Sequence, residues 1–187
     1  MDEKKISQKT LNKSFNLWFW GALTCFSQEH MQTFGYLSSM LPIIKELYPD
    51  KKEQQEKIHA YTAFFNTNPM LGSVIIGTTA SMEEARANGK GIDGETINDM
   101  RAGLMGPIAG IGDSLIDGTL IPILLGLALG MSQNGSPVGA IFYIIVWDHI
   151  AYFGQRFLYF RGYKLGDKAV SILVGKQGKA IRHAISI

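Results

Sequence analysis

Long stretches of the chain carry almost no charge. Residues 118–147 contain no charged side chain, residues 58–82 contain only His59 among the basic and acidic side chains, and residues 14–44 are interrupted only by Glu29 and His30. Soluble amphipathic helices place a charge every few residues on their solvent face, and these stretches do not. A charged side chain at the centre of a bilayer costs about 2.5–3.5 kcal/mol, so a bilayer favours such stretches. The pattern predicts an integral membrane protein.

Near the N-terminus, apolar side chains recur at helical spacing. Leu11, Phe15, Trp18 and Phe19 fall on one face of a helix. We expect an amphipathic helix at the membrane surface, with the aromatic residues 18–20, including Trp20, at headgroup level. The alternative is a soluble helix whose aromatic face packs into a protein core.

Proline residues and charged patches predict where the next segments end. The apolar segment 30–44 is expected to end at Pro42, before a charged patch. Asp50 follows a proline and reads as the start of a helix that begins charged and becomes apolar. The residue before Pro69 is biased away from helix, and Pro69 itself suits a first helical turn. Residues 66–68 are therefore expected to form a break between two apolar segments.

The apolar segments around this break are short. Residues 70–80 would span roughly 16 Å at 1.5 Å per residue, which is about half a bilayer. Ser81 and Glu84 then match a capping box, which predicts a new short helix ending near Gly89.

A second group of short segments follows. Asp93 is expected to start a helix that leads into the uncharged residues 102–112, again about half a bilayer long. Residues 118–147 supply two apolar arms around a turn at 132–137. Breaks at Gly-Pro and short arms are typical of re-entrant or discontinuous membrane helices.

Composition narrows the classes of function. The chain has 187 residues, 18% of them charged, and a formal net charge of +2, so no nucleic-acid partner is expected. A single cysteine, Cys25, excludes a disulfide framework. Glycine accounts for 21 residues, and the spacings Gly106–Gly110 and Gly126–Gly130 would allow close helix contact. Residues 1–13 and 156–187 are rich in Lys and Arg, which favours the cytoplasmic side for both.

Polar groups at two predicted breaks are candidates for a binding site. The first break holds Asn66, Thr67 and Asn68, and the second, residues 110–114, holds Asp113. Non-helical backbone at membrane depth must be buried in protein or line a wet cavity. Carboxylates accept hydroxyl donors and amides both donate and accept, which suits a neutral polyhydroxylated ligand. The alternative is that Asn66 and Asp113 only cap the helices that follow them.

Three further acidic residues lie in or beside apolar stretches. Glu29 interrupts a long apolar span, with Gln32 close by, and its alternative role is an ion pair with a partner subunit. Asp117 follows Asp113 by one helical turn on the same face. Asp148 follows Trp147 and is interpreted as a membrane boundary.

The sequence contains no motif that indicates an enzyme. The run from Gly110 fails the dinucleotide fingerprint because Leu115 stands where a third glycine is needed. The four histidines include no H-x-x-x-H pair, and a single thiol cannot make a Cys-pair site. We expect no catalytic residue, no cofactor and no metal. A soluble glycine-rich enzyme is kept as a rival to the membrane interpretation.

Several strings together resemble one known family, the IID component of mannose-family sugar phosphotransferase systems (mannose, fructose, sorbose or N-acetylgalactosamine type). Glu29, Met31, Gln32 and Gly35 fit the early segment of that family. The strongest resemblance lies in Phe64-Phe65-Asn66-Thr67-Asn68-Pro69, in Met82-Glu83-Glu84 with Ala87-Asn88-Gly89, and in Gly103-Leu104-Met105-Gly106-Pro107-Ile108-Ala109-Gly110-Ile111-Gly112-Asp113.

The resemblance implies an all-α integral membrane protein with re-entrant helices and surface amphipathic helices, in a subunit of an elevator-type transporter. It implies a multi-pass permease subunit of the bacterial inner membrane, in a trimer of IIC–IID pairs. The pair would bind and translocate a hexose or amino sugar, which a IIB partner phosphorylates. IIB and IIA are the phosphocarrier proteins, and the phosphate comes ultimately from phosphoenolpyruvate. The IID chain itself is then non-catalytic, and its remaining partner is the lipid bilayer. A membrane scaffold that supports IIC without touching sugar is the alternative.

The resemblance also selects the candidate sugar-binding residues, which are Glu29, Gln32, Asn66, Asn68 and Asp113. Asp117 stands where many relatives have an aromatic residue, so it is not included. Residues 1–187 are expected to form a single IID membrane domain. Family members are typically longer, so we expect that this chain lacks their C-terminal hydrophobic segments.

Overall fold

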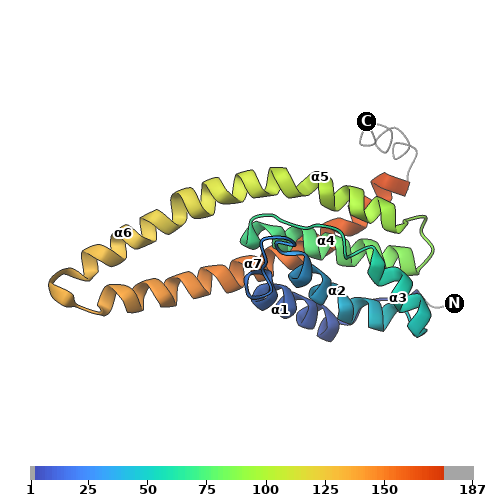
Figure 1. Ribbon diagram of the computed structural model, residues 1–187, viewed down its shortest axis with the longest axis horizontal. Coiled ribbons are helices and arrows are strands. Elements are labelled where there is room, and N and C mark those ends of the chain that lie inside the picture. Colours follow the sequence, from blue (N-terminus) through green and yellow to red (C-terminus); the bar gives the residue numbers. More distant parts are fainter. Residues whose placement is uncertain (1–2, 175–187) are drawn as a thin grey trace.

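The computed structural model describes residues 3–174, and every regular element in that range is a helix. Figure 1 shows a body built from the first four helices and crossed by the last helix, together with a long hairpin that extends away from the body. Residues 175–187, the end of the predicted cytoplasmic segment, lie outside the described range. In chain order the elements are α1 (Gln8–Thr24), α2 (Thr33–Leu47), α3 (Lys51–His59), α4 (Pro69–Ala87), α5 (Gly94–Gly112), the π-helix η1 (Asp113–Leu120), α6 (Ile121–Met131), the 3-10 turn η2 (Gln133–Gly135) and α7 (Val138–Val174).

The predicted helix starts are confirmed by their caps. The Asp50 carboxylate accepts hydrogen bonds from the backbone N–H groups of residues 52 and 53 and begins α3. Pro69 is the first residue of α4, and the Asp93 carboxylate accepts from the backbone N–H of Thr96 at the start of α5. Each cap satisfies backbone donors that have no partner within the helix.

The predicted end at Pro42 is wrong, because α2 continues through Pro42 to Leu47. Proline inside a helix removes one backbone hydrogen bond. The last turn nevertheless buries Ile43, Ile44 and Leu47 completely or almost completely in the core, and this apolar burial offsets the lost bond.

The predicted new helix at Ser81 is also wrong. Helix α4 runs without interruption past Ser81 and ends at Ala87, close to the predicted end, where Gly89 adopts φ 68°. Glu84 does not reach back to a helix start, since it accepts hydrogen bonds from the backbone of Ile6 and from the Tyr163 hydroxyl. Burial of this stretch against neighbouring helices keeps the helical hydrogen bonds intact where the local motif alone predicts a break.

The Gly-Pro stretch does not break the chain either. Helix α5 passes through Pro107 and continues directly into η1 and α6, so that Gly94–Met131 forms one curved rod of 38 residues (Figure 1). The structure thus replaces the predicted break by a π-helical stretch. The predicted turn at 132–137 is confirmed, with Gly135 at φ 76°. Within the described range, this rod is the single helix whose length and composition suit a membrane crossing.

The aromatic face of α1 lies in the protein core rather than at the membrane surface. Phe15 and Trp18 are fully buried, and the Trp18 indole donates to the Ser73 hydroxyl at 3.0 Å. The core alternative is therefore the correct one for this face. Trp20 lies on the opposite side of the helix and is 67% exposed.

Close helix contact uses other glycines than those with the predicted spacing. A Cβ atom on any of the four predicted glycines, residues 106, 110, 126 and 130, would meet no atom within 4 Å. A Cβ on Gly77 of α4 would lie 1.9 Å from the Tyr159 carbonyl oxygen of α7, and one on Gly162 would lie 2.2 Å from the Val74 carbonyl oxygen. A Cβ on Gly139 of α7 would also lie 1.8 Å from the Ala128 carbonyl oxygen of α6, so the α4–α7 contact and the packing of the hairpin both depend on missing side chains.

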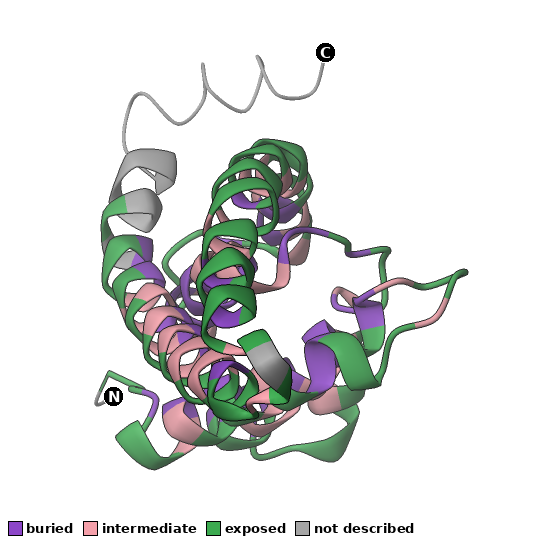
Figure 2. Ribbon diagram, turned by 90° about the vertical axis from the view of Figure 1, so that its left-hand side faces the viewer, coloured by how far each residue is buried: buried purple, intermediate pink, exposed green. Residues whose placement is uncertain are grey.

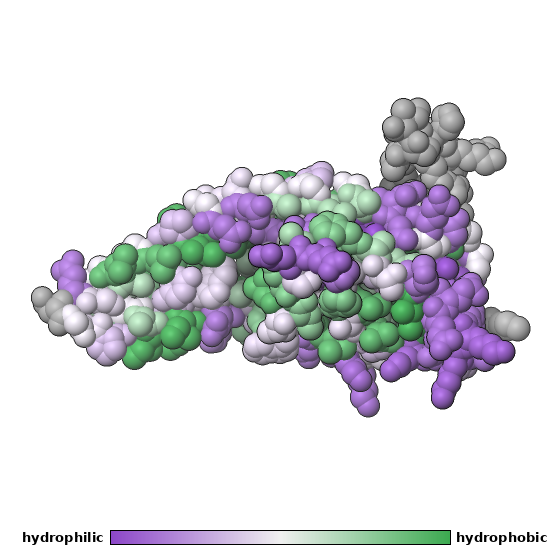
Figure 3. Space-filling model, viewed as in Figure 1, coloured by the Kyte–Doolittle hydropathy of each residue, from purple (hydrophilic) through white to green (hydrophobic). Residues whose placement is uncertain are grey.

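The hairpin exposes most of its apolar side chains. Buried residues gather in the body, whereas the hairpin arms are largely exposed in Figure 2. Figure 3 shows hydrophobic surface along both arms, between a hydrophilic tip and a hydrophilic end of the body. The exposed residues include Leu127 and Leu129 of α6 and Ile141, Ile144 and Ile145 of α7. Such a surface is typical of contact with lipid or with a partner protein.

Candidate functional site

The loop that contains Gln32 and the loop that leads into Asn68 lie side by side at one end of α4. The backbone N–H of Gln32 donates to the Phe65 carbonyl oxygen at 2.9 Å. The Gln32 side chain is buried, donates to the Thr67 carbonyl oxygen at 2.8 Å and accepts from the Thr67 N–H at 3.2 Å. A buried backbone break needs such partners, because an unpaired donor or acceptor costs about 1–3 kcal/mol. Gln32 therefore holds the loop that leads into Asn68.

Asn68 joins this loop to the hairpin rod. Its Oδ1 atom accepts hydrogen bonds from the backbone N–H groups of residues 70 and 71 and so caps α4. Its Nδ2 atom donates to Asp113 Oδ1 at 3.1 Å and to Asp117 Oδ2 at 3.0 Å. One buried amide thus uses its acceptor to start a helix and its two donor hydrogens to hold two carboxylates.

The two carboxylates lie in the π-helical part of the rod. Asp113 and Asp117 are both exposed. Asn68 contacts one oxygen of each carboxylate, which leaves each with a second oxygen that can accept hydrogen bonds. Stretches of π-helix occur frequently at functional sites. The arrangement forms an acceptor-rich surface with one fixed amide at its base.

Gly112 allows this contact. A Cβ atom at position 112 would lie 2.3 Å from the Cβ and Cγ atoms of Asn68, far inside van der Waals contact. Any larger residue would push the rod away from the loop and lengthen both Asn68–carboxylate hydrogen bonds. The Gly112-Asp113 pair in the sequence thus has a direct steric reason.

Comparison with known proteins decides the family. A family profile described as "PTS system mannose/fructose/sorbose family IID component" matches residues 5–187. The sorbose-specific EIID component of Klebsiella pneumoniae is 35% identical over 190 residues, covering 100% of this chain and 68% of that protein. The mannose-specific EIID component of Escherichia coli K12 is 37% identical over 168 residues, covering 86% of this chain and 58% of that protein.

The chain belongs to the IID components of the mannose/fructose/sorbose PTS family. A solved structure described as the mannose transporter ManYZ in complex with microcin E492 matches with a TM-score of 0.87 and 32% identity, over 98% of this chain and 66% of that chain. Membership confirms the family resemblance, the helical membrane fold and a non-catalytic role in a sugar phosphotransferase system. This IID chain spans 68% of the length of the Klebsiella pneumoniae protein and 58% of the length of the Escherichia coli protein.

Within the IID chain, the structure connects three of the five predicted site residues. The Gln32 side chain donates a hydrogen bond to Thr67, and the next residue, Asn68, donates one to Asp113. These contacts connect the loop of Gln32 to the rod. The capping alternative fails for Asn66 and Asp113, because the residue that caps α4 is Asn68 and Asp113 lies inside a continuous helical rod.

The other two predicted residues lie on the same pair of loops but outside this chain of contacts. Glu29 is 84% exposed, and its carboxylate lies 3.9 Å from the His30 ring nitrogen. Asn66 is exposed, and its backbone N–H contacts the Met105 sulfur at 3.4 Å. The structure therefore presents both side chains at the surface.

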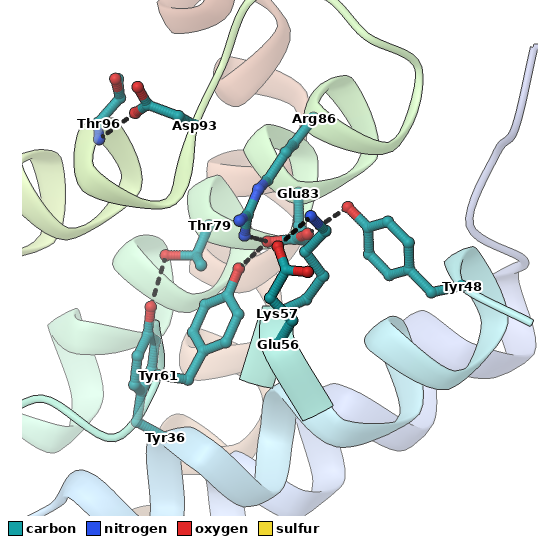
Figure 4. Close-up of polar contacts among 10 residues, drawn as sticks. All are labelled: Tyr36, Tyr48, Glu56, Lys57, Tyr61, Thr79, Glu83, Arg86, Asp93 and Thr96. Carbon is teal, nitrogen blue, oxygen red and sulfur yellow. Dashed lines mark hydrogen bonds and ion pairs between the residues drawn. The ribbon is translucent and has the colours of Figure 1, made fainter. Parts of the chain in front are cut away.

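Sequence reasoning missed two features of this IID chain. Asp117 shares Asn68 with Asp113, and its spacing of one turn was the signal that pointed to it. The second feature is a buried carboxylate in the body, Glu83, which accepts hydrogen bonds from the hydroxyls of Tyr48 and Tyr61 and lies 3.4 Å from Arg86 (Figure 4). No local motif distinguishes Glu83 from its neighbour Glu84.

The Glu83 cluster ties α4 to the segments before it. Burial raises the pKa of Tyr61, and the charge of Glu83 raises it further. The same two causes, in the same order, raise the pKa of Tyr48. Both tyrosines thus stay protonated as donors to the carboxylate, and the Arg86 guanidinium supplies the compensating positive charge. A buried charge is tolerated only with such partners.

Proposed function

We propose that this IID chain is a multi-pass permease subunit of the bacterial inner membrane that, together with a IIC subunit, binds and translocates a hexose or amino sugar. In this proposal the pairs assemble as trimers, the IIB partner phosphorylates the sugar, and IIA and IIB are the phosphocarrier proteins. The family membership and the likeness to a mannose transporter support the transport role. The exposed apolar hairpin supports a position among lipid and a membrane partner.

One observation carries the sugar-contact part of the proposal: the Asn68 amide holds the carboxylates of Asp113 and Asp117 side by side. Their remaining oxygens can accept hydrogen bonds from neighbouring hydroxyls, which a sugar ring supplies. Gln32 acts by positioning the loop that carries Asn68. A neutral ligand with several hydroxyls suits this surface better than an anion, which the two charges would repel.

Glu29 and Asn66 complete the proposed site from the neighbouring loops. Both side chains are exposed on loops joined through the Gln32–Phe65 hydrogen bond. Exposed polar groups beside a membrane partner gain hydrogen-bond partners when the partner covers them. In the proposal the IIC subunit covers this surface, so the sugar site lies at the IIC–IID interface.

The test uses the full-length protein assembled with its IIC subunit and compares three variants. Asn68→Asp keeps the acceptor that caps α4 but removes the donors and adds a like charge beside Asp113 and Asp117. Asp113→Asn removes one acceptor charge. Each is expected to weaken sugar binding by about 5- to 150-fold, because a hydrogen-bonding partner lost in a buried site costs about 1–3 kcal/mol. Asp99→Asn, an exposed carboxylate on α5, is the control and should bind sugar normally.

Thermal unfolding and co-purification with IIC must first show that each variant is assembled. If assembled Asn68→Asp and Asp113→Asn complexes bind and transport sugar like the unchanged protein, the sugar-contact proposal is wrong. That result would favour the scaffold alternative, in which IID supports IIC without touching the sugar.

A further inference from the structure

A hollow on the C-terminal half of α7 combines positive charge with aromatic rings. Its volume is about 470 Å³, and it opens to the surface beside the body. The six residues that line it are Phe153, Arg156, Phe157, Phe160, Arg161 and Lys164. Three cations and three phenylalanines thus form one surface, with no acidic residue among the lining residues.

The aromatic rings position the two arginines. The Arg156 guanidinium lies 4.9 Å from the ring centre of Phe160, and the Arg161 guanidinium lies 5.1 Å from that of Phe157. Among the ion pairs between side chains that the structure describes, none involves these arginines or Lys164. A guanidinium stacked on a ring keeps its five N–H donors in the plane of the group, available to an anion at the edge.

A second hollow of about 570 Å³ continues this surface onto α1. Arg156 donates to the Asn12 side chain at 2.9 Å, and Asn12 lines the second hollow together with Lys9, Lys13 and Trp20. None of its lining residues is acidic either. Exposed tryptophan next to lysine is typical of the headgroup level of a membrane.

The position along α7 indicates what covers this surface. The same helix begins in the hairpin, where Ile141, Ile144 and Ile145 are exposed. Farther along, the exposed Asp148 and His149 interrupt this apolar surface, and it resumes at Phe153 and Phe157, which are about 60% exposed and lie next to the cations. With the boundary at Asp148, the exposed aliphatic residues before it match hydrocarbon, and the aromatic residues, arginines and lysine after it match the headgroup level of a bilayer.

We propose that the surface of Arg156, Arg161 and Lys164 binds the phosphate headgroup of an anionic phospholipid, with Phe153 and Phe157 against the upper part of its acyl chains. Charge complementarity selects an anionic lipid, since each Lys or Arg near an anionic membrane contributes about 1 kcal/mol. The exposed phenylalanines select a lipid over a free phosphate ion, which gains nothing from apolar surface. The lipid site is distinct from the proposed sugar site at Asp113.

The experiment measures bound lipid on the full-length protein purified with its IIC subunit. Native mass spectrometry counts phosphatidylglycerol and phosphatidylcholine retained from equimolar mixtures, and inorganic phosphate is tested separately as a competitor. The variant Arg161→Gln/Lys164→Gln leaves the Arg156–Asn12 hydrogen bond in place. Each lost cation should lower phosphatidylglycerol affinity by about 5-fold, so the pair should lower it by about 25-fold. Phosphatidylcholine retention should not change.

The control variant Lys51→Gln/Lys52→Gln removes two exposed cations from α3 and should retain lipid normally. Asp113→Asn should also retain it, which separates this proposal from the sugar site. Equal retention of both lipids, or of phosphatidylglycerol by the double variant, would overturn the proposal. Displacement of the lipid by millimolar phosphate would show a simple anion site instead. Absence of phosphatidylglycerol from the assembled complex would show that a protein surface covers these residues.

Discussion

The hairpin arm α6 is more apolar than the body helix α4, yet α4 is the buried one. Helix α4 contains polar residues such as Thr79 and Glu83, and both are fully buried. Helix α6 consists almost entirely of aliphatic residues, and Leu127 and Leu129 are 54% and 71% exposed. Apolar composition therefore does not determine which helix lies in the protein core. In α4, small residues permit close backbone approach to α7, and hydrogen-bond partners such as those of Thr79 and Glu83 compensate the buried polar groups.

Helix α7 belongs to both regions and shows the difference within one element. In the body, Gly162 allows the α4 backbone to approach so closely that a Cβ atom would lie 2.2 Å from the Val74 carbonyl oxygen. In the hairpin, most of the apolar residues of α7 face outward, toward lipid or a partner. In the body, α7 is thus packed closely against α4, whereas in the hairpin it leaves a large apolar surface exposed.

The largest effect on the body is expected from the buried carboxylate. Glu83→Ala leaves the hydroxyls of Tyr48 and Tyr61 and the Arg86 guanidinium without their acceptor. We expect a loss of about 3–5 kcal/mol in the free energy of unfolding, measured by denaturant unfolding in detergent. Glu56→Ala removes an exposed carboxylate paired only with Lys57 and should cost less than about 1 kcal/mol. Equal losses for the two variants would show that the Glu83 cluster does not stabilise the body.

In the hairpin, an added charge on the apolar surface should impair membrane insertion. Leu127→Arg places a cation on the exposed apolar arm, which costs about 2.5–3.5 kcal/mol at the centre of a bilayer. We expect less of the protein in the membrane fraction after flotation, with the unfolding of purified protein in detergent unchanged. Gln133→Arg at the hairpin tip, in the turn η2, is the matched control and should insert normally. Normal insertion of Leu127→Arg would show that this arm does not contact lipid.

Paired glycine substitutions provide the finest comparison. Gly77→Ala forces a Cβ atom against the Tyr159 carbonyl oxygen and should lower the free energy of unfolding by about 1–3 kcal/mol. Gly126→Ala meets open space and should be neutral or stabilising by up to about 1 kcal/mol, because alanine favours helix over glycine. Thermal unfolding of both variants in the same detergent makes the comparison. A reversed order would contradict the close α4–α7 contact.

Much of the helix layout followed from local chemistry. Asp50, Pro69 and Asp93 start helices where predicted, because a cap satisfies donors within a few residues of itself. The turn at 132–137 was predicted for a similar reason, since Gly135 adopts the positive φ that favours glycine. The predicted breaks at Pro42 and Ser81 failed because burial of the helix against its neighbours outweighs a local signal.

The candidate site also combines features that the sequence determined with features that only the tertiary structure decided. The sequence alone determined that amides and carboxylates such as Asn68 and Asp113 lie in apolar surroundings, because charges and their absence are local properties. Only the tertiary structure decided that Asn68 holds Asp117 as well as Asp113, and that Gly112 makes room for it. These partners are more than 40 residues apart in sequence, and their contact depends on how the rod packs against the loop. No pattern within a few turns of helix contains that information.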